Sequence, residues 1–319
     1  MKSKISLFLT LALTAFAMVE CKKKTEEPEP EPEPTPTAGI STLADLFATN
    51  GSPFVNFTVS ATAPSTITSN DVTIEFPANA FQTSTSGTVT GNVVISVKTI
   101  LTKDQIILTG AQANSTNSRL VTTKGCVKLT ASQNSQSLRL SPASGTVFVS
   151  LPDGPVTPQA TKKYYVSKLS VTDSTKVWAM EADTNNVQAV WSPTLSKYVH
   201  RAGLDSLKWL NVGKQWDTTG LKVPMVATVN ASMFNKNNCA VYISFNGSLT
   251  IGAMYEISPG VYRISNMPNG KGVHIVGISV IDGQYYSAIM STAVSTSTFG
   301  LNMQPTSFSN LVTSLKNLP

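Results

Sequence analysis

Apolar and polar residues alternate along most of the chain between residues 54 and 305, and turn residues interrupt the alternation at short intervals. Within residues 89–100, for example, Val93, Ile95 and Val97 fall on one face of an extended chain. A period of two residues is typical of half-buried β-strands, and many short strands in succession are typical of β-sandwiches. The pattern therefore predicts an all-β protein with two antiparallel β-sandwich domains.

Helical spacing marks the two ends of this region. Apolar residues at positions 40, 43, 46 and 47 follow the period of a helix, with Ser41 or Thr42 as the N-terminal cap. Another set, at positions 308, 311, 312, 315 and 318, follows Thr306 and Ser307. We therefore expect a short N-terminal helix and a short C-terminal helix.

Two turn signals lie in the second half of the chain. Asn246-Gly247 and Asp282-Gly283 are residue pairs that favour the two-residue turns of β-hairpins. The second pair is expected to join strands at residues 273–281 and 284–294.

The first residues have the layout of an export signal. Lys2 and Lys4 precede a mostly apolar run at residues 5–19, which is too short to span a bilayer and suits a secretory signal peptide. Cys21 and three lysines follow, and this arrangement resembles bacterial lipoprotein signals, whose cysteine is diacylated. The resemblance implies that Cys21 anchors the protein to the outer membrane through diacylglycerol. Residues 15–17 read Ala-Phe-Ala, so cleavage by the ordinary signal peptidase stays open as the alternative.

Glu and Pro alternate in residues 27–34. Proline fixes the backbone and like charges repel, so residues 25–37 are expected to form an extended spacer of roughly 40–50 Å. Acidic residues soon after the cysteine resemble the surface-export signal of Bacteroidota lipoproteins, which favours exposure at the cell surface. The alternative is a tether without further function.

The predicted organisation has six parts. They are a lipoprotein signal peptide at residues 1–20, the lipidated cysteine with its Glu/Pro-rich linker at 21–38, a first β-sandwich at 39–155, a connecting β segment at 156–202, a second β-sandwich at 203–305, and the C-terminal helix at 306–319.

The chain carries 24 basic and 18 acidic side chains, a formal charge of +6. The basic excess is scattered singly, without the basic stripe and interleaved aromatic motif that nucleic-acid-binding proteins show. Nucleic acid is therefore not expected as a partner. A mild attraction to anionic glycans is compatible with the same charge.

Three segments of the first predicted sandwich form a motif. They are residues 72–81, which end in Phe76-Pro77-Ala78-Asn79-Ala80-Phe81, and residues 87–91 and 108–111. Together they resemble a β domain of many uncharacterised Bacteroidota lipoproteins and, more distantly, ZU5-type sandwiches. We interpret the motif mechanically: Pro77 ends a strand, and Ala80 and Phe81 fold back as a plug at the corner of the sandwich. The resemblance implies an interaction or assembly module and assigns no catalytic residue.

In the second predicted sandwich, residues 260–264, 266–270 and 273–278 alternate strand and turn patterns. They are similar to the carboxypeptidase-regulatory, transthyretin-like sandwich. This similarity also implies a β-sandwich.

The sequence contains no recognisable catalytic motif. His200 and His274 are the only histidines, and their separation excludes the short helical motif of zinc proteases. A glycan hydrolase would require acids such as Glu181, Asp183 or Asp217 to converge in a cleft. We therefore predict no enzyme activity, no metal and no cofactor.

Cys126 and Cys239 are the two cysteines that follow Cys21. An even number in an exported protein is compatible with a disulfide. Because they fall in different predicted domains, two buried thiols are the alternative.

Aromatic side chains are the remaining candidates for ligand binding, since exposed rings stack on sugar faces. Trp191 and Trp216 have the most polar neighbours of the four tryptophans and are predicted to be exposed. Tyr285 and Tyr286 must point to opposite faces of a strand, so one is expected to be accessible. Trp191, Trp216 and Tyr285 are the predicted ligand-binding residues.

These patterns favour a non-enzymatic lipoprotein that is anchored to the outer membrane, exposed at the cell surface, and binds a glycan or a protein. A second hypothesis is an envelope scaffold or assembly factor that faces the periplasm. A glycan hydrolase is the third.

Overall fold

The computed structural model describes residues 39–115, 120–154, 163–167, 178–180, 187–216 and 220–319. The expected signal peptide, Cys21 and the Glu/Pro-rich linker lie outside these residues. So do Glu181, Asp183 and Asp217, the acids considered for a hydrolase. For the strands at 163–167 and 178–180 only the backbone is described.

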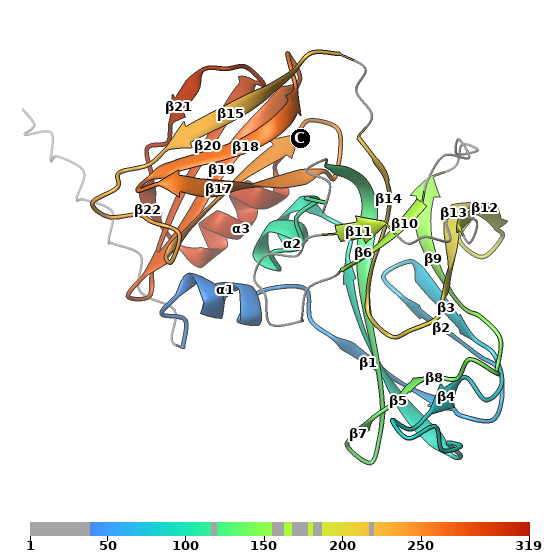
Figure 1. The fold of residues 1–319 in the computed structure, drawn as a ribbon. Helices are drawn as coiled ribbons and strands as arrows, with labels where there is room; N and C mark the ends of the chain where they lie inside the picture. The colour runs from blue at the N-terminus through green and yellow to red at the C-terminus, as the bar shows by residue number, and fades with distance from the viewer. Residues whose placement is uncertain (1–38, 116–119, 155–162, 168–177, 181–186, 217–219) are drawn as a thin grey trace, which may run out of the picture. The chain divides into compact units, whose positions relative to one another are not determined.

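The described part of the chain is built mostly from strands in antiparallel sheets, with three short helices (Figure 1). The prediction of an all-β protein with small helices is therefore confirmed. In this part of the chain no helix is both long and apolar enough to cross a membrane.

Two sheets form the first part of the fold. A seven-stranded sheet has the order β1 (Val55–Ser60), β5 (Asn92–Ile100), β6 (Val121–Gln133), β14 (Trp209–Gln215), β10 (Lys163–Ser167) and β11 (Trp178–Met180), with β7 (Gln136–Ser137) paired to β6. A five-stranded sheet has the order β12 (Val187–Ser192), β13 (Lys197–Leu204), β9 (Val147–Gly154), β3 (Val72–Phe76) and β2 (Ser65–Ser69).

Side chains from both sheets bury one another in a shared core. Ile95 and Leu129 come from the seven-stranded sheet, and Ile74 and Val149 come from the five-stranded sheet. Two apolar sheet faces that cover each other make the sandwich that the alternating pattern predicted.

The Phe-Pro-Ala-Asn-Ala-Phe segment folds back into this core as its motif predicted. Phe76 and Phe81 are buried, and their ring centroids lie 5.3 Å apart. β4 (Phe81–Gln82) pairs with β8 (Arg139–Leu140), and the Ser141 amide donates to the Ala80 carbonyl (2.9 Å). The segment therefore closes a corner of the sandwich.

Strand β14 joins the first sheet, although the sequence placed residues 203–305 in the second sandwich. It pairs with β6 on one side and with β10 on the other. Leu210 and Val212 face the sandwich core, which explains why this strand is more stable there.

The second part of the fold is one eight-stranded sheet that curls into a half-barrel (Figure 1). Its order is β21 (Thr298–Gly300), β15 (Lys222–Thr228), β18 (Val261–Pro268), β17 (Ile251–Ser258), β16 (Cys239–Phe245), β19 (Gly272–Ile281), β20 (Gln284–Ala293) and β22 (Gln304–Thr306). β15 and β21 run parallel, and the other neighbours run antiparallel.

The curl originates at β17. Residues 251–254 of this strand pair with β16, whereas Tyr255, Glu256 and Ser258 pair with β18. Because one strand changes partners along its length, the sheet bends over its own core, which contains Phe245, Tyr262 and Met267.

Three helices cover the outer face of this sheet and also contact the seven-stranded sheet. They are α1 (Leu43–Thr49), α2 (Lys103–Leu108) and α3 (Phe308–Lys316). Their cluster contains Leu46, Ile107 and Leu315 together with Ile100 of β5 and Tyr285 of β20. The two terminal helices were predicted, whereas α2 was not, because six residues are too few to display a helical period.

Candidate functional site

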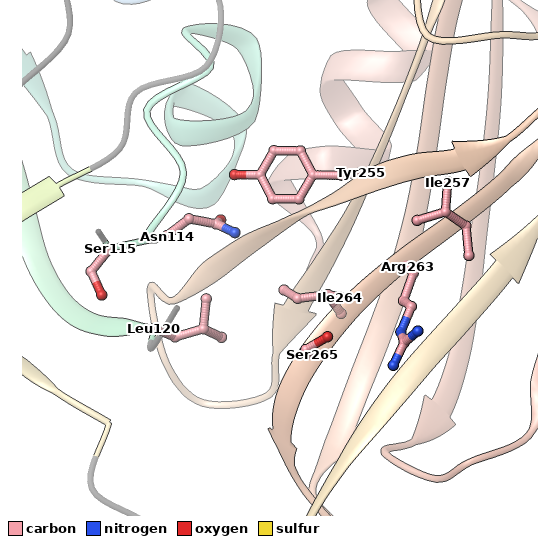
Figure 2. Close-up of a pocket in the computed structure, with 8 residues that line it drawn as sticks. All are labelled: Asn114, Ser115, Leu120, Tyr255, Ile257, Arg263, Ile264 and Ser265. Atoms are coloured by element: carbon pink, nitrogen blue, oxygen red, sulfur yellow. The ribbon is translucent and has the colours of Figure 1, made fainter. Parts of the chain in front are cut away.

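A hollow of about 490 Å³ lies beside strands β17 and β18 (Figure 2). Strand residues on its wall are Tyr255 and Ile257 of β17, and Arg263, Ile264 and Ser265 of β18. Asn114, Ser115 and Leu120 of the segment between α2 and β6 line the other side. Its size is within the usual range of small-ligand pockets.

Tyr255 and Ile257 expose apolar surface in this hollow. The Tyr255 side chain is 44% exposed and Ile257 is 59% exposed. Tyr255 is paired with Arg263 of β18, and Ile257 lies at an irregularity in the pairing of the two strands. An exposed aromatic ring next to an exposed aliphatic side chain is suited to the apolar face of a ligand.

Arg263 provides the charge of the site. It lies directly opposite Tyr255 in the β17–β18 pair and is exposed. No carboxylate of the described residues forms an ion pair with it. Its planar guanidinium can therefore donate two parallel hydrogen bonds to a carboxylate of a ligand.

Hydrogen bonds hold the Asn114 side of the hollow in place. The Asn114 side chain donates to the Ala253 carbonyl (3.1 Å) and accepts from the Ala253 amide (2.7 Å). This pairing imitates a neighbouring strand and ties the segment after α2 to β17. The wall is therefore preformed.

The Tyr255 hydroxyl remains neutral at physiological pH. The ring is exposed, but partial burial of the hydroxyl group raises the pKa of Tyr255 above its usual value of 10. In the view of Figure 2 the hydroxyl points toward the side of the hollow that carries Asn114 and Ser115. The group can donate a hydrogen bond to a ligand from this position.

A second hollow, of about 530 Å³, contains three lysines and an acid. Asp153 accepts hydrogen bonds from the Lys124 ammonium and from His200 Nε2 (2.8 Å), and Lys197 is paired with Asp71 (2.8 Å). Only Lys214 on its wall has no ion pair among the described residues. The charges of this second hollow are thus largely satisfied within the protein. The Tyr255 hollow, whose arginine has no such partner among the described residues, is the stronger candidate.

Trp191, one of the three predicted ligand-binding residues, lies on the edge strand β12 and is 45% exposed. Its ring meets that of Tyr198 edge-on, with 5.2 Å between centroids. It lies on a different sheet from Tyr255, and none of the described hollows includes it.

Trp216 is half-buried instead of exposed. Its ring packs on Phe245 with 4.3 Å between centroids and contributes to the core of the half-barrel. The prediction that Trp216 is exposed, which rested on its polar neighbours Gln215 and Asp217, is therefore wrong. Contacts with β16, a strand that follows later in the chain, decide the burial of Trp216.

Tyr285 is 1% exposed, so the structure contradicts its place on a binding surface. Helix α3 covers it, and its ring lies 5.7 Å from that of Phe308. Tyr286 points to the opposite face, as predicted, where it packs against Phe234. Both faces of β20 are covered at this position.

Cys126 and Cys239 are both buried thiols, and no disulfide joins them. Cys126 belongs to the helix-covered cluster and Cys239 to the core of the half-barrel. Burial raises the pKa of Cys239 to about 12, which keeps this thiol protonated and unreactive. Of the two alternatives, the structure supports buried thiols.

The Tyr255 hollow was not identified from the sequence. The one signal was a continuous apolar run at residues 251–255, which is typical of a strand buried on both faces. Such a run does not indicate that Tyr255 is exposed. Within the described residues, no group of three or more histidine, cysteine or acidic side chains could hold a metal ion.

A scan against protein-family models, a search of curated proteins and a search of solved structures each find no match to this chain. The resemblances to Bacteroidota lipoprotein domains and to the transthyretin-like sandwich therefore rest on the sequence motifs alone.

Proposed function

We propose that the chain is a lipid-anchored, non-enzymatic binding module of the outer-membrane surface, and that the Tyr255 hollow takes an acidic saccharide. The observation that carries this proposal is the direct pairing of an exposed tyrosine with an exposed arginine in one preformed hollow. The tyrosine ring stacks on the apolar face of a sugar, and the arginine binds its carboxylate.

Two further features support binding over hydrolysis. None of the described residues that line the hollow carries a carboxylate, whereas glycoside hydrolysis uses a pair of them. The export signal and Cys21 that the sequence predicts support a position at the membrane.

Substitutions in the hollow test the ligand class. We expect Tyr255→Ala to weaken binding of trigalacturonate by about tenfold, because an aromatic stacking contact is lost. Arg263→Ala is expected to remove the preference for trigalacturonate over the neutral maltotriose. Isothermal titration calorimetry with both sugars measures the effects.

Trp191→Ala is the matched control, since it removes an exposed aromatic ring of another sheet. Its affinity for trigalacturonate is expected to equal that of the unmodified protein. Loss of binding in Trp191→Ala with unchanged binding in Tyr255→Ala would overturn the proposed site.

The periplasm-facing scaffold is the alternative, and one observation favours it. β1 is an edge strand of the seven-stranded sheet, and its first residue Val55 and the preceding Phe54 are exposed. Exposed edges can pair with a strand of another protein.

Protease treatment of intact cells separates the two locations. We expect proteinase K to remove the folded part of the protein, followed by immunoblot, while a periplasmic control protein survives. Protection until the outer membrane is opened would contradict surface exposure and support the scaffold.

A further inference from the structure

Two lysines face each other across neighbouring strands of the seven-stranded sheet. Lys98 of β5 lies directly opposite Lys128 of β6. Ile95 and Val97 point into the sandwich core, so Lys98 lies on the outer face of the sheet. Both lysines are half-buried.

Both ammonium groups lie over the same aromatic ring. The Nζ atoms of Lys98 and Lys128 are 4.9 Å and 5.6 Å from the centroid of Phe54, and Lys128 Nζ is also 5.6 Å from the centroid of Trp209. The Phe54 ring is itself exposed. Two positive charges therefore converge beside an accessible apolar surface.

No carboxylate balances these charges in the part of the chain that the structure describes. Lys124, Lys197 and Lys208 each have an acidic partner there, whereas Lys98 and Lys128 have none. Like charges directly opposite each other destabilise a sheet. Burial lowers the pKa of both lysines, and Lys98 lowers that of Lys128 further.

Packing of the two aliphatic stems explains only part of this arrangement. Lysine stems commonly cover aromatic rings while the charged ends turn to water, and the ring attracts each ammonium weakly. Neither effect requires two ammonium groups at one ring. A bound anion would remove their repulsion, which accounts for the pair.

We propose that Lys98 and Lys128 form a binding site for a phosphate or sulfate ester group, with Phe54 packing against the molecule that carries it. The anion accepts charge-assisted hydrogen bonds from both ammonium groups. The site is on a different sheet from the Tyr255 hollow, so it does not depend on the proposed function.

Thermal unfolding in phosphate tests the site. At constant ionic strength, inorganic phosphate is expected to raise the unfolding midpoint of the unmodified protein, since a ligand stabilises the state that binds it. Lys98→Met and Lys128→Met are each expected to abolish this rise. Lys271→Met, which removes one exposed lysine at the turn between β18 and β19, serves as the control and is expected to retain the rise.

The phosphate-free midpoint separates binding from a structural role. Removing either lysine relieves repulsion, so both variants are expected to unfold at or above the midpoint of the unmodified protein. An equal phosphate effect in all four proteins would overturn the proposal. So would a lower phosphate-free midpoint in both lysine variants.

The carrier of the anion is identified by a second comparison. Glucose 6-phosphate is expected to bind about tenfold more tightly than inorganic phosphate, and Phe54→Ala is expected to remove that difference. Equal affinities in the unmodified protein would assign the site to the free anion and overturn the role of Phe54. Binding to anionic vesicles alone, without either soluble ligand, would overturn the ester site itself.

The pH dependence has a defined sign. Other ionisable groups on β1, β5, β6 and β14 are Lys124, Cys126 and Lys214. Because the folded pKa values of Lys98 and Lys128 are lowered, the unfolded chain binds more protons just below pH 10.5, and the stability of the free protein rises with pH there. Phosphate affinity is expected to fall over the same interval as the ammonium groups lose their protons.

Discussion

Replacing Gly213 with alanine is expected to lower the free energy of unfolding by about 3 kcal/mol, at the upper end of overpacking effects. A Cβ atom at this position would lie 2.3 Å from the Thr122 carbonyl oxygen and 2.8 Å from Val121 Cγ1. The first of these is a backbone atom, which cannot turn aside as a side chain can.

The surroundings of Gly213 leave little room for adjustment. β14 is paired on both sides, and its register with β6 shifts between Val212 and Gly213. Gly125, beside this irregularity on β6, has a φ of +145°, and its own Cβ would lie 2.6 Å from Leu101 Cδ2. The close approach of β14 to β6 therefore depends on Gly213, whereas Gly125 makes room for Leu101.

Urea denaturation of Gly213→Ala measures the loss. Gly220→Ala is the matched control, because a Cβ there meets no atom within 4 Å, and we expect a change of no more than about 0.5 kcal/mol. Similar stabilities of the two variants would show that β6 can move away from β14.

Asp153→Ala is the second substitution with a large expected effect, a loss of about 2–4 kcal/mol. The Asp153 carboxylate accepts hydrogen bonds from the Lys124 ammonium and from His200 Nε2. The side chains of Asp153 and His200 are only 8% and 2% exposed. Without the carboxylate, the buried Nε2–H group loses its acceptor at this position. The cost is the desolvation of that group in addition to the lost ion pair.

Asp71→Ala provides the comparison. Asp71 also pairs with a lysine, Lys197, but its side chain is 57% exposed. Exposed ion pairs contribute little, so the expected loss is under about 1 kcal/mol. Urea denaturation measures both losses. Equal losses in the two variants would show that burial does not strengthen the contacts of Asp153.

Features encoded by neighbouring residues could be predicted from the sequence. Thr42 and Asp45 form a capping box at the start of α1. The Thr42 hydroxyl accepts from the Asp45 amide, and the Asp45 carboxylate accepts from the Thr42 amide. Asp282 and Gly283 both have positive φ values, and their turn pairs Ile281 with Gln284 at the end of β19 and β20. Each of these signals acts within a few residues.

Features that depend on distant contacts could not be predicted. The wall of the Tyr255 hollow requires Asn114 to meet Ala253, 139 positions further along the chain. The opposition of Lys98 and Lys128 depends on the pairing register of β5 and β6. An alternating pattern shows which residues share a face, but not which strand lies beside it or which helix covers it.

The position of β14 determines how this protein can be divided. The chain leaves the sandwich for the half-barrel only after Gln215, and the helices between the two parts take apolar residues from both. Neither part is thus a portable module that recombination could transfer intact to another protein. A cut at residue 203 would separate β14 from β6, and the exposed backbone of both strands would then be open to aggregation. The described residues 39–319 belong to one compact unit.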